Sequence, residues 1–310
     1  MQLISSQLNL DFLGPRKYAW ILSAVLILVS IASLWFRGLS LGVDFTGGTL
    51  VEVGYPQAVE LQQVRGALEV GGFEDALVQH FGTAKDVLVR LPSNEDESSA
   101  NLSNRVLQAL ASTGDPEMRR VEFVGPQVGE ELRDDGGLAV IYALFGILIY
   151  VGLRFEYRFS FGAVAALIHD VVLVLGFFSL VQAEFDLTVL AAVLAVIGYS
   201  LNDTIVLFDR VRENFRKLRK KTPEEIINVS VNQTLSRTLM TSITTLMVLF
   251  ALFVFGGEVI HAFSLALIVG VIIGTYSSIY IASSSLLLLN VSVADLLPVE
   301  KEDGEANSMP

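Results

Sequence analysis

A carboxamide and a carboxylate interrupt an apolar stretch of this sequence. Asn202 and Asp203 lie within residues 187–208, which are otherwise long and apolar enough to cross a bilayer. Burying a carboxylate in hydrocarbon is costly unless the group is paired or neutralised. Because ionisable groups inside spanning segments usually mark ion pathways, Asp203 is predicted to couple to an ion, with Asn202 beside it.

Arg237 is the expected counter-charge of Asp203. Thr222, Pro223 and Glu225 have the spacing of a capping box with proline at the first helical position, which predicts a helix starting near Pro223 and running into the next apolar segment. With a rise of about 1.5 Å per residue, Arg237 should lie near the depth of Asp203, so the two are predicted to pair. The alternative is that the arginine extends to the inner interface.

His169 and Asp170 lie near the middle of residues 159–181, another apolar segment. Such a pair could relay protons or contact an ion, and it could equally be an internal hydrogen-bonded pair that fixes the helix packing. A metal site is weakly indicated, because one histidine and one carboxylate are few ligands. Nearer the C-terminus, Gly270 and Gly274 form a GxxxG pair, which predicts close helix packing.

The elements that position these residues follow from composition. The chain has 310 residues, of which 52% are hydrophobic and 17% charged, and its mean hydropathy is +0.57. Soluble domains carry about 25% charged residues, so the composition indicates a membrane protein. The predicted fold is a polytopic α-helical membrane protein with six spans, at residues 18–36, 137–153, 159–181, 187–208, 234–257 and 262–289.

Lysine and arginine predict the orientation of these spans. They are concentrated in the N-terminal segment 1–17, in the loop 154–158 and in the loop 209–233, whereas residues 182–186 have none. The positive-inside rule therefore places both termini in the cytoplasm, together with the acidic tail 290–310. Residues 37–136 are then expected outside.

The outer segment 37–136 is predicted to be a ferredoxin-like α+β domain. Alternating strands and helix-periodic stretches follow one another in the order β-α-β-β-α-β. It contains no recognisable catalytic constellation, so no enzyme activity and no cofactor are predicted. The chain has no cysteine, which excludes disulfides and thiol catalysis, and its net charge of −12 gives no support for nucleic-acid binding.

The loop 209–233 begins with an amphipathic pattern. Phe208, Val211, Phe215 and Leu218 recur at helical spacing, and basic residues occupy the other faces. This pattern predicts a helix at the membrane interface, with its apolar face in the bilayer and its charges near anionic lipid head groups.

A second motif, "LGVDFTGGTLVEV" at 41–53, follows the first span and contains Asp44, Gly47 and Gly48. The two glycines predict a turn before a strand, because glycine adopts positive φ at low cost. Glycines at this joint could also serve as a hinge for the outer domain.

Three segments together resemble the SecF family of the resistance-nodulation-division superfamily. They are "LGVDFTGGTLVEV", "GYSLNDTIVLFDRVREN" (198–214) and "LSRTLMTSITTLMVLFALFVFGG" (235–257). The resemblance implies a multi-pass subunit of the bacterial cytoplasmic (inner) membrane that pairs with SecD. It implies work with the SecYEG channel, and indirectly with SecA, in drawing unfolded preproteins outward with a proton or sodium gradient. It assigns the ion-responsive carboxylate to Asp203 and its partner to Arg237, with a further acidic residue supplied by SecD.

Two other functions are compatible with the same residues. A proton-driven small-molecule exporter of this superfamily would use a similar Asp–Arg pair, but usually in a duplicated chain. A purely structural assembly subunit of the translocation machinery would need no ion coupling at all.

Overall fold

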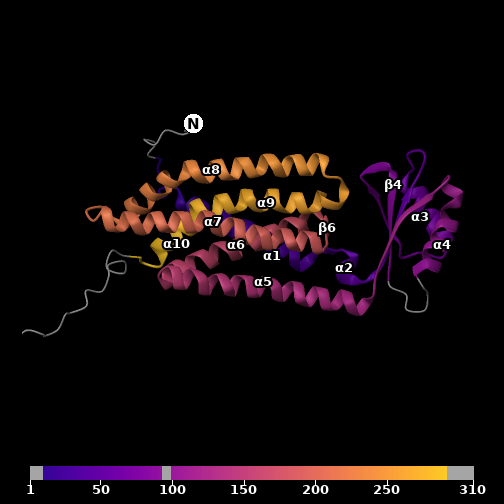
Figure 1. Cartoon of the computed structure of the whole chain (residues 1–310), viewed down its shortest axis with the longest axis horizontal. Coiled ribbons are helices and arrows are strands. Elements are labelled where there is room, and N and C mark those ends of the chain that lie inside the picture. Colours follow the sequence, from indigo (N-terminus) through magenta and orange to yellow (C-terminus); the bar gives the residue numbers. More distant parts are fainter. Residues whose placement is uncertain (1–9, 93–98, 292–310) are drawn as a thin grey trace, which may run out of the picture.

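The structure is a computed structural model that describes residues 10–92 and 99–291. The chain is elongated, with a helix bundle at one end and a small α/β domain at the other (Figure 1). Most of the predicted acidic tail 290–310, the first nine residues of the predicted N-terminal segment and the polar loop 93–98 lie outside the described residues.

Within the described residues, six helical segments are long and apolar enough to cross a membrane, so this is a multi-pass membrane protein. The last of them is continuous from a 3₁₀ turn, η2, through a π-helical stretch, η3. The segments are α1 (Arg16–Phe36), α5 (Pro126–Arg154), α6 (Tyr157–Val181), α7 (Leu187–Lys217), α8 (Pro223–Phe255) and η2–α9–η3–α10 (Glu258–Ile260, His261–Ser277, Ser278–Ala282, Ser283–Leu288).

Three helices, α5, α7 and α8, extend well beyond the apolar windows that mark the predicted spans. Helix α5 begins at Pro126, eleven residues before residue 137, and carries its polar first turns out to the α/β domain. Helix α7 continues through the basic segment to Lys217. Hydropathy detects the part of a helix that fits the bilayer, whereas the helix itself ends only where its backbone pattern is broken. The capping box at Thr222 and Glu225 is present, and α8 starts at Pro223.

The α/β domain contains a four-stranded antiparallel sheet in the order β3-β4-β2-β5. Helices α3 and α4 contribute Val64, Leu68, Val106 and Leu110 to the core on one face of this sheet. The arrangement is the predicted ferredoxin-like one. Its elements are β2 (Gly48–Gly54), α3 (Leu61–Val70), β3 (Leu77–Phe81), β4 (Thr83–Leu91), α4 (Ser99–Leu110) and β5 (Glu117–Val124).

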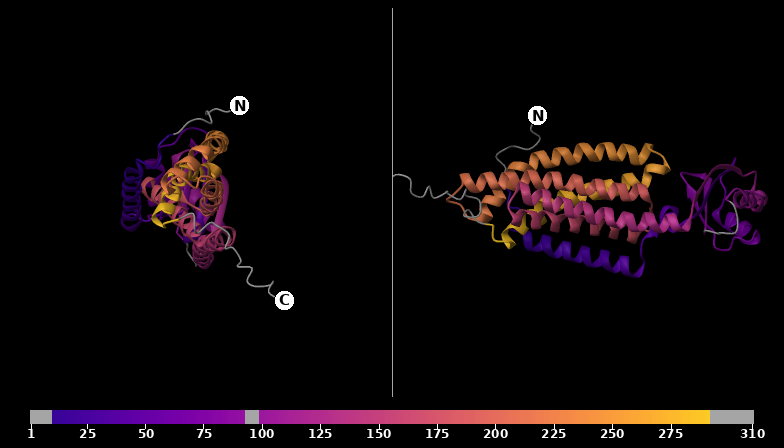
Figure 2. Two further views of the ribbon diagram at one scale, coloured as in Figure 1. Left: turned by 90° about the vertical axis from the view of Figure 1, so that its left-hand side faces the viewer. Right: turned by 60° about the horizontal axis from the view of Figure 1, so that its bottom comes forward.

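The helices of the bundle pack around α6 and α7, while α1 lies along the side of the bundle (Figure 2). The predicted lipid-facing stripe on α7 is wrong for three of its residues. Phe208, Val211 and Phe215 are fully buried in a core that also contains Ile226 and Ile227 of α8. The start of α8 folds back over this end of α7, so the stripe meets protein instead of bilayer.

The joint between the bundle and the outer domain is built from short elements. After α1, strand β1 (Ser40–Leu41) pairs in parallel with β6 (Glu184–Phe185), which connects α6 to α7. A one-turn helix, α2 (Val43–Thr46), then leads into β2. The backbone amide of Gly42 donates to the carbonyl of Phe185 at 2.9 Å, so the linker is bonded directly to the bundle.

Candidate ion-coupling site in the helix bundle

Asp203 lies on the inward face of α7, and only 3% of its surface is exposed. Its Oδ2 atom is buried and has no hydrogen-bond partner among the described residues. A buried carboxylate oxygen without a donor is costly and needs an explanation such as a bound proton, an ion or a partner chain. The structure therefore places an incomplete polar site where the sequence predicts ion coupling.

Arg237, on α8, exerts an electrostatic attraction on Asp203. The guanidinium and the carboxylate make no ion pair within 4.0 Å in the described part of the chain, so the structure brings them into range without direct contact. Arg237 is exposed on the surface of the bundle, as is Asn202 next to the carboxylate. The charged partner of Asp203 thus faces outward, where another subunit can reach it.

A π-helical stretch, η3, lies beside this segment of α7. The hydroxyls of Thr204 and Ser278 are 3.2 Å apart, which joins the residue after Asp203 to the first residue of η3. π-helical turns inside α-helices are rare and occur frequently at functional sites. The helix that contacts Thr204, one residue away from Asp203 in the sequence, is therefore locally widened.

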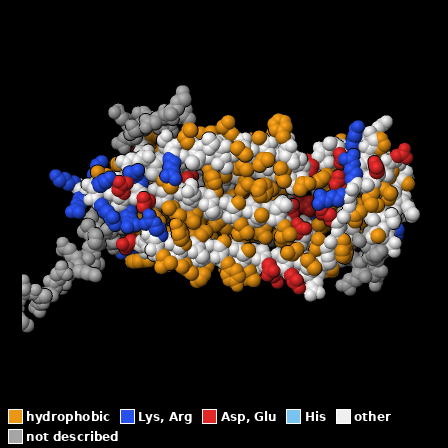
Figure 3. Space-filling view, in the orientation of Figure 1, with side chains coloured by type: hydrophobic (Ala, Val, Ile, Leu, Met, Phe, Trp, Pro, Cys, Tyr) orange, Lys and Arg blue, Asp and Glu red, His pale blue; other side chains and the backbone are white. Residues whose placement is uncertain are grey.

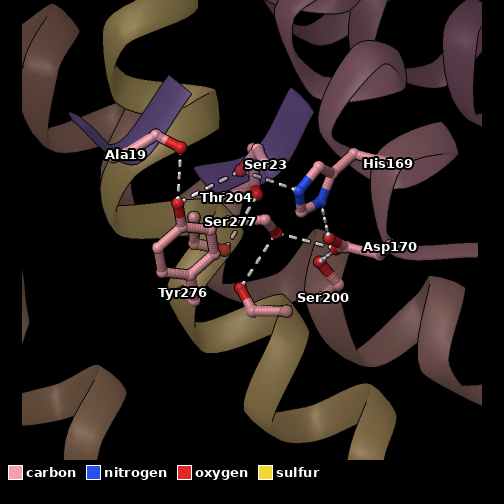
Figure 4. A network of polar contacts seen from close by, with 10 residues as sticks. Ala19, Ser23, His169, Asp170, Ser200, Thr204, Tyr276 and Ser277 are labelled. Carbon is pink, nitrogen blue, oxygen red and sulfur yellow. Dashed lines mark hydrogen bonds and ion pairs between the residues drawn. The ribbon is translucent and has the colours of Figure 1, made fainter. Parts of the chain in front are cut away.

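Asp170 is fully buried on α6, one helix away from Asp203, and it makes three hydrogen bonds (Figure 4). Its Oδ2 atom accepts from Ser200 Oγ of α7 at 2.6 Å and from Ser277 Oγ of α9 at 2.8 Å. Its Oδ1 atom lies 2.9 Å from His169 Nδ1. The predicted His–Asp pair is thus a junction between three helices.

The other ring nitrogen of His169 continues the network into α1 (Figure 4). Nε2 lies 3.1 Å from Ser23 Oγ, and Ser23 Oγ lies 3.1 Å from the hydroxyl of Tyr276. Tyr276 in turn donates to the backbone carbonyl of Ala19 at 2.9 Å. Both ring nitrogens of His169 are therefore occupied by protein groups.

Close helix packing brings these groups together. A Cβ atom at Gly270 would lie 2.1 Å from Val196 Cγ2, and one at Gly274 would lie 3.0 Å from the Cβ atom of Ser200. The GxxxG pair therefore lets α9 approach α7, as predicted. Ser200 and Asp203 are three residues apart on α7, so the network and the Asp203 site share one helix.

The signature residues Asp44, Gly47 and Gly48 lie at the joint instead of in the bundle. Asp44 Oδ2 accepts from the backbone amide of Leu187 at 3.0 Å, which satisfies a donor at the start of α7. Gly47 has φ +68°, and a Cβ there would lie 2.9 Å from Pro126 Cα. The glycines thus serve a turn and a close contact with α5.

Sequence reasoning missed Ser23, the residue that links the His–Asp pair to α1. Helix α1 places Ser23, Ser30 and Ser33 at helical spacing on its buried face, so the sequence holds a signal for a polar stripe but none that distinguishes Ser23 within it. Ser277 and Tyr276 were recognisable only as polar surface on their span.

Comparisons with known proteins agree with the resemblance of the three motifs. The family model "Protein export membrane protein SecD/SecF, C-terminal" matches residues 105–292, and the "SecD/SecF GG Motif" matches residues 32–59. The protein translocase subunit SecF of Vibrio alginolyticus is 50% identical over 100% of this chain and 99% of its own length. That of Pseudomonas aeruginosa is 52% identical over 95% and 96%.

A solved structure has the same fold. The crystal structure of SecDF, a translocon-associated membrane protein from Thermus thermophilus, matches 93% of this chain with a TM-score of 0.85 and 38% sequence identity. This chain spans 40% of the length of that one. The family models, the full-length relatives and the shared fold together show that the chain belongs to the SecF family of protein-export membrane proteins.

Proposed function

We propose that this chain is the SecF subunit of the Sec protein-translocation machinery in a bacterial cytoplasmic membrane. In this role it pairs with a SecD subunit and uses a proton or sodium gradient to promote late steps of preprotein export through SecYEG, after SecA has acted. It works as a transport subunit and not as an enzyme. Names of the relatives and the joined SecDF chain of the solved structure support the assignment.

The observation that carries the proposal is the buried, incompletely bonded carboxylate of Asp203 within the electrostatic range of Arg237. Arginine stays charged at all accessible pH values, so Asp203 is the member of the pair that exchanges a proton. A change in its charge alters the attraction between α7 and α8 and can bias the packing of the two helices. Each proton crossing 100 mV supplies roughly 2.3 kcal/mol for such a change.

The distribution of charge supports an orientation with both termini in the cytoplasm. Basic side chains gather at the end of the bundle that is remote from the α/β domain (Figure 3). They include Arg216 and Lys217 at the end of α7. Under the positive-inside rule this end faces the cytoplasm and the α/β domain lies outside.

The exposed position of Arg237 favours this function over a structural role. A charged residue on the surface of a spanning helix is expensive in lipid, but it becomes useful where a partner supplies an acidic group. The family implies such a group on SecD. Export of small molecules is the alternative function. An assay of preprotein translocation distinguishes the two, because only a protein-export subunit should stimulate it.

The test uses membrane vesicles that carry this chain with SecD and SecYEG. Asp203→Asn and Arg237→Met should each abolish the stimulation of preprotein translocation by an ion gradient, while the amount of chain in the membrane stays unchanged. The double variant should be no worse than either single one, because the residues act as one unit. Asp209→Asn is the matched control, since Asp209 lies on the same helix and its side chain is 60% exposed. Full stimulation in Asp203→Asn would refute ion coupling through this residue.

A further inference from the structure

We propose that His169 and Asp170 together bind one exchangeable proton, which gives the chain a second protonation site besides Asp203. The inference follows from counting hydrogen atoms along the buried network of Figure 4. It stands independently of the role in secretion, because it concerns only which atoms in the bundle carry protons.

The count starts at Ala19. Its backbone carbonyl oxygen can only accept a hydrogen bond, so the hydroxyl of Tyr276, 2.9 Å away, must donate to it. A phenol has a single hydrogen. The same hydroxyl lies 3.1 Å from Ser23 Oγ, and in that second contact it can act only as the acceptor.

Ser23 must therefore donate its own single hydrogen to Tyr276. Its oxygen also lies 3.1 Å from His169 Nε2. Because the serine hydrogen is already used, this contact is a hydrogen bond only when Nε2 carries a hydrogen and donates it to Ser23. The chain of contacts thus assigns a proton to Nε2.

The contact of 2.9 Å between His169 Nδ1 and Asp170 Oδ1 requires a hydrogen as well. Either Nδ1 carries it, which makes the ring a cation beside a carboxylate, or Oδ1 carries it, which makes both groups neutral. Both forms hold one proton more than a neutral histidine beside a carboxylate. The pair then has no net charge, which suits its nearly complete burial.

The groups around His169 and Asp170 do not remove the need for this extra proton. Ser200 donates to Asp170 Oδ2 at 2.6 Å. Ser277 Oγ lies 2.8 Å from the same oxygen and 3.2 Å from the carbonyl oxygen of Gly274, and its single hydrogen takes the shorter contact. Among the elements packed against α6, α9 brings the ring of Tyr276 to 6.2 Å from that of His169, and η3 carries Tyr280, whose ring lies 5.3 Å from that of Tyr276. Helix α7 carries Tyr199 and Asp203 on either side of Ser200 in the sequence. Helix α1 has no ionisable residue between Tyr18 and Arg37, and the tyrosines of α5, Tyr142 and Tyr150, are exposed.

Loss of the proton has a defined structural effect. When Nε2 keeps its hydrogen, Nδ1 and Asp170 Oδ1 face each other without one. When Nδ1 keeps its hydrogen instead, Ser23 has to turn its hydroxyl from Tyr276 to Nε2 to keep that contact. The oxygens of Ser23 and Tyr276 would then face each other without a hydrogen between them, and in either case a net negative charge would remain in the bundle. Proton release therefore weakens either the His169–Asp170 contact or the contacts that join α1 to α6 and α9.

The test measures the protons directly in the purified full chain in lipid nanodiscs. Only three histidines occur in the sequence, so ¹⁵N-histidine labelling gives few signals, and His169→Gln identifies the one of interest. Infrared spectra of the same samples, compared with Asp170→Asn, report a protonated carboxyl group. At neutral pH we expect hydrogen on Nε2, together with either a doubly protonated ring or a protonated Asp170.

Tyr276→Phe frees Ser23 to donate to Nε2, so the pair should lose its proton more readily. We expect the signal of the extra proton to be weaker in this variant than in the unaltered chain under the same conditions. Tyr280→Phe is the matched control: its ring lies 5.3 Å from that of Tyr276, and its hydroxyl has no hydrogen bond within the described residues. An Nε2 without hydrogen at neutral pH, or a neutral ring beside an ionised Asp170, would overturn the proposal. An equally weak signal in the two tyrosine variants would also overturn it.

These spectra are independent of the assay for export. If Asp203→Asn retained full gradient stimulation, the proposed function would fail and the protonated pair would stand. If the spectra showed no extra proton, the pair would be a structural link and the proposed function would stand.

Discussion

Adding one methyl group at Gly129 should disturb the contact between α5 and the Gly47–Gly48 turn. A Cβ atom at Gly129 would lie 2.7 Å from the backbone nitrogen of Gly47 and 3.2 Å from the carbonyl carbon of Phe45. Both neighbours are backbone atoms and cannot move aside as a side chain can. Gly137, on the same helix, has nothing within 4 Å of its Cβ position and serves as the matched control.

Both substitutions to alanine gain helix propensity, worth up to about 1 kcal/mol. Only Gly129→Ala also forces overpacking, which typically costs about 1–3 kcal/mol. Opening of the joint should therefore become easier in Gly129→Ala than in Gly137→Ala by roughly that amount. Amide hydrogen exchange at residues 43–48 should be about 5- to 150-fold faster in the first variant.

The comparison separates two explanations of the glycines. If they serve close packing, the two alanine variants differ as described. If Gly129→Ala and Gly137→Ala give the same hydrogen exchange at residues 43–48, then close packing of α5 against the turn is not the reason for glycine at positions 47, 48 and 129. A hinge would then be the better account of the motif.

Two further predictions concern topology and pH. Reporter fusions at Gly114 and Lys220 should lie outside and inside respectively, and the opposite result at either site would refute the proposed orientation. Burial raises the pKa of Glu184 above its ordinary 4.5, although Arg90 and a hydrogen bond from Gln79 lower it. When the α/β domain is docked against β6, Glu184 therefore binds its proton more tightly than when the domain is detached from β6. Docking should weaken as the pH rises from 4.5 through the raised pKa and stay constant above it. Glu184→Gln should remove this dependence, measured as exchange at residues 77–81 corrected for intrinsic rates; docking that strengthens with pH would contradict the reasoning.

The fold was largely predictable, because its signals are periodic and local. Apolar windows of about 20 residues identified six spans, and alternation in the outer segment identified the ferredoxin-like order. The environment of the α7 stripe was not predictable in the same way. Phe208 and Phe215 have an amphipathic spacing whether their partner is lipid or protein, and only the return of α8 over them decides which.

The candidate site was predictable only in part, because some of its residues stand out in the sequence and others do not. A carboxylate such as Asp203 in an apolar segment is conspicuous by its cost alone. The serines that bind Asp170 are not, since serine is cheap to bury in a helix where its hydroxyl can bond the preceding turn. Which serine meets the carboxylate depends on helix rotation and approach, here set by Gly270 and Gly274.

The short parallel pairing of β1 with β6 limits how the outer domain can move. A body held by two tethers can swing about the line that joins them, whereas a third support off that line removes this rotation. Here the chain enters through β1, which is held against the bundle by its pairing with β6, and leaves through α5. The β3–β4 turn also meets the bundle, since a Cβ at Gly82 would lie 2.9 Å from Glu258 Cγ. The domain should therefore tilt as a rigid body together with the outer ends of α6 and α7. Its angle to the bundle should change whenever the packing of the spanning helices changes.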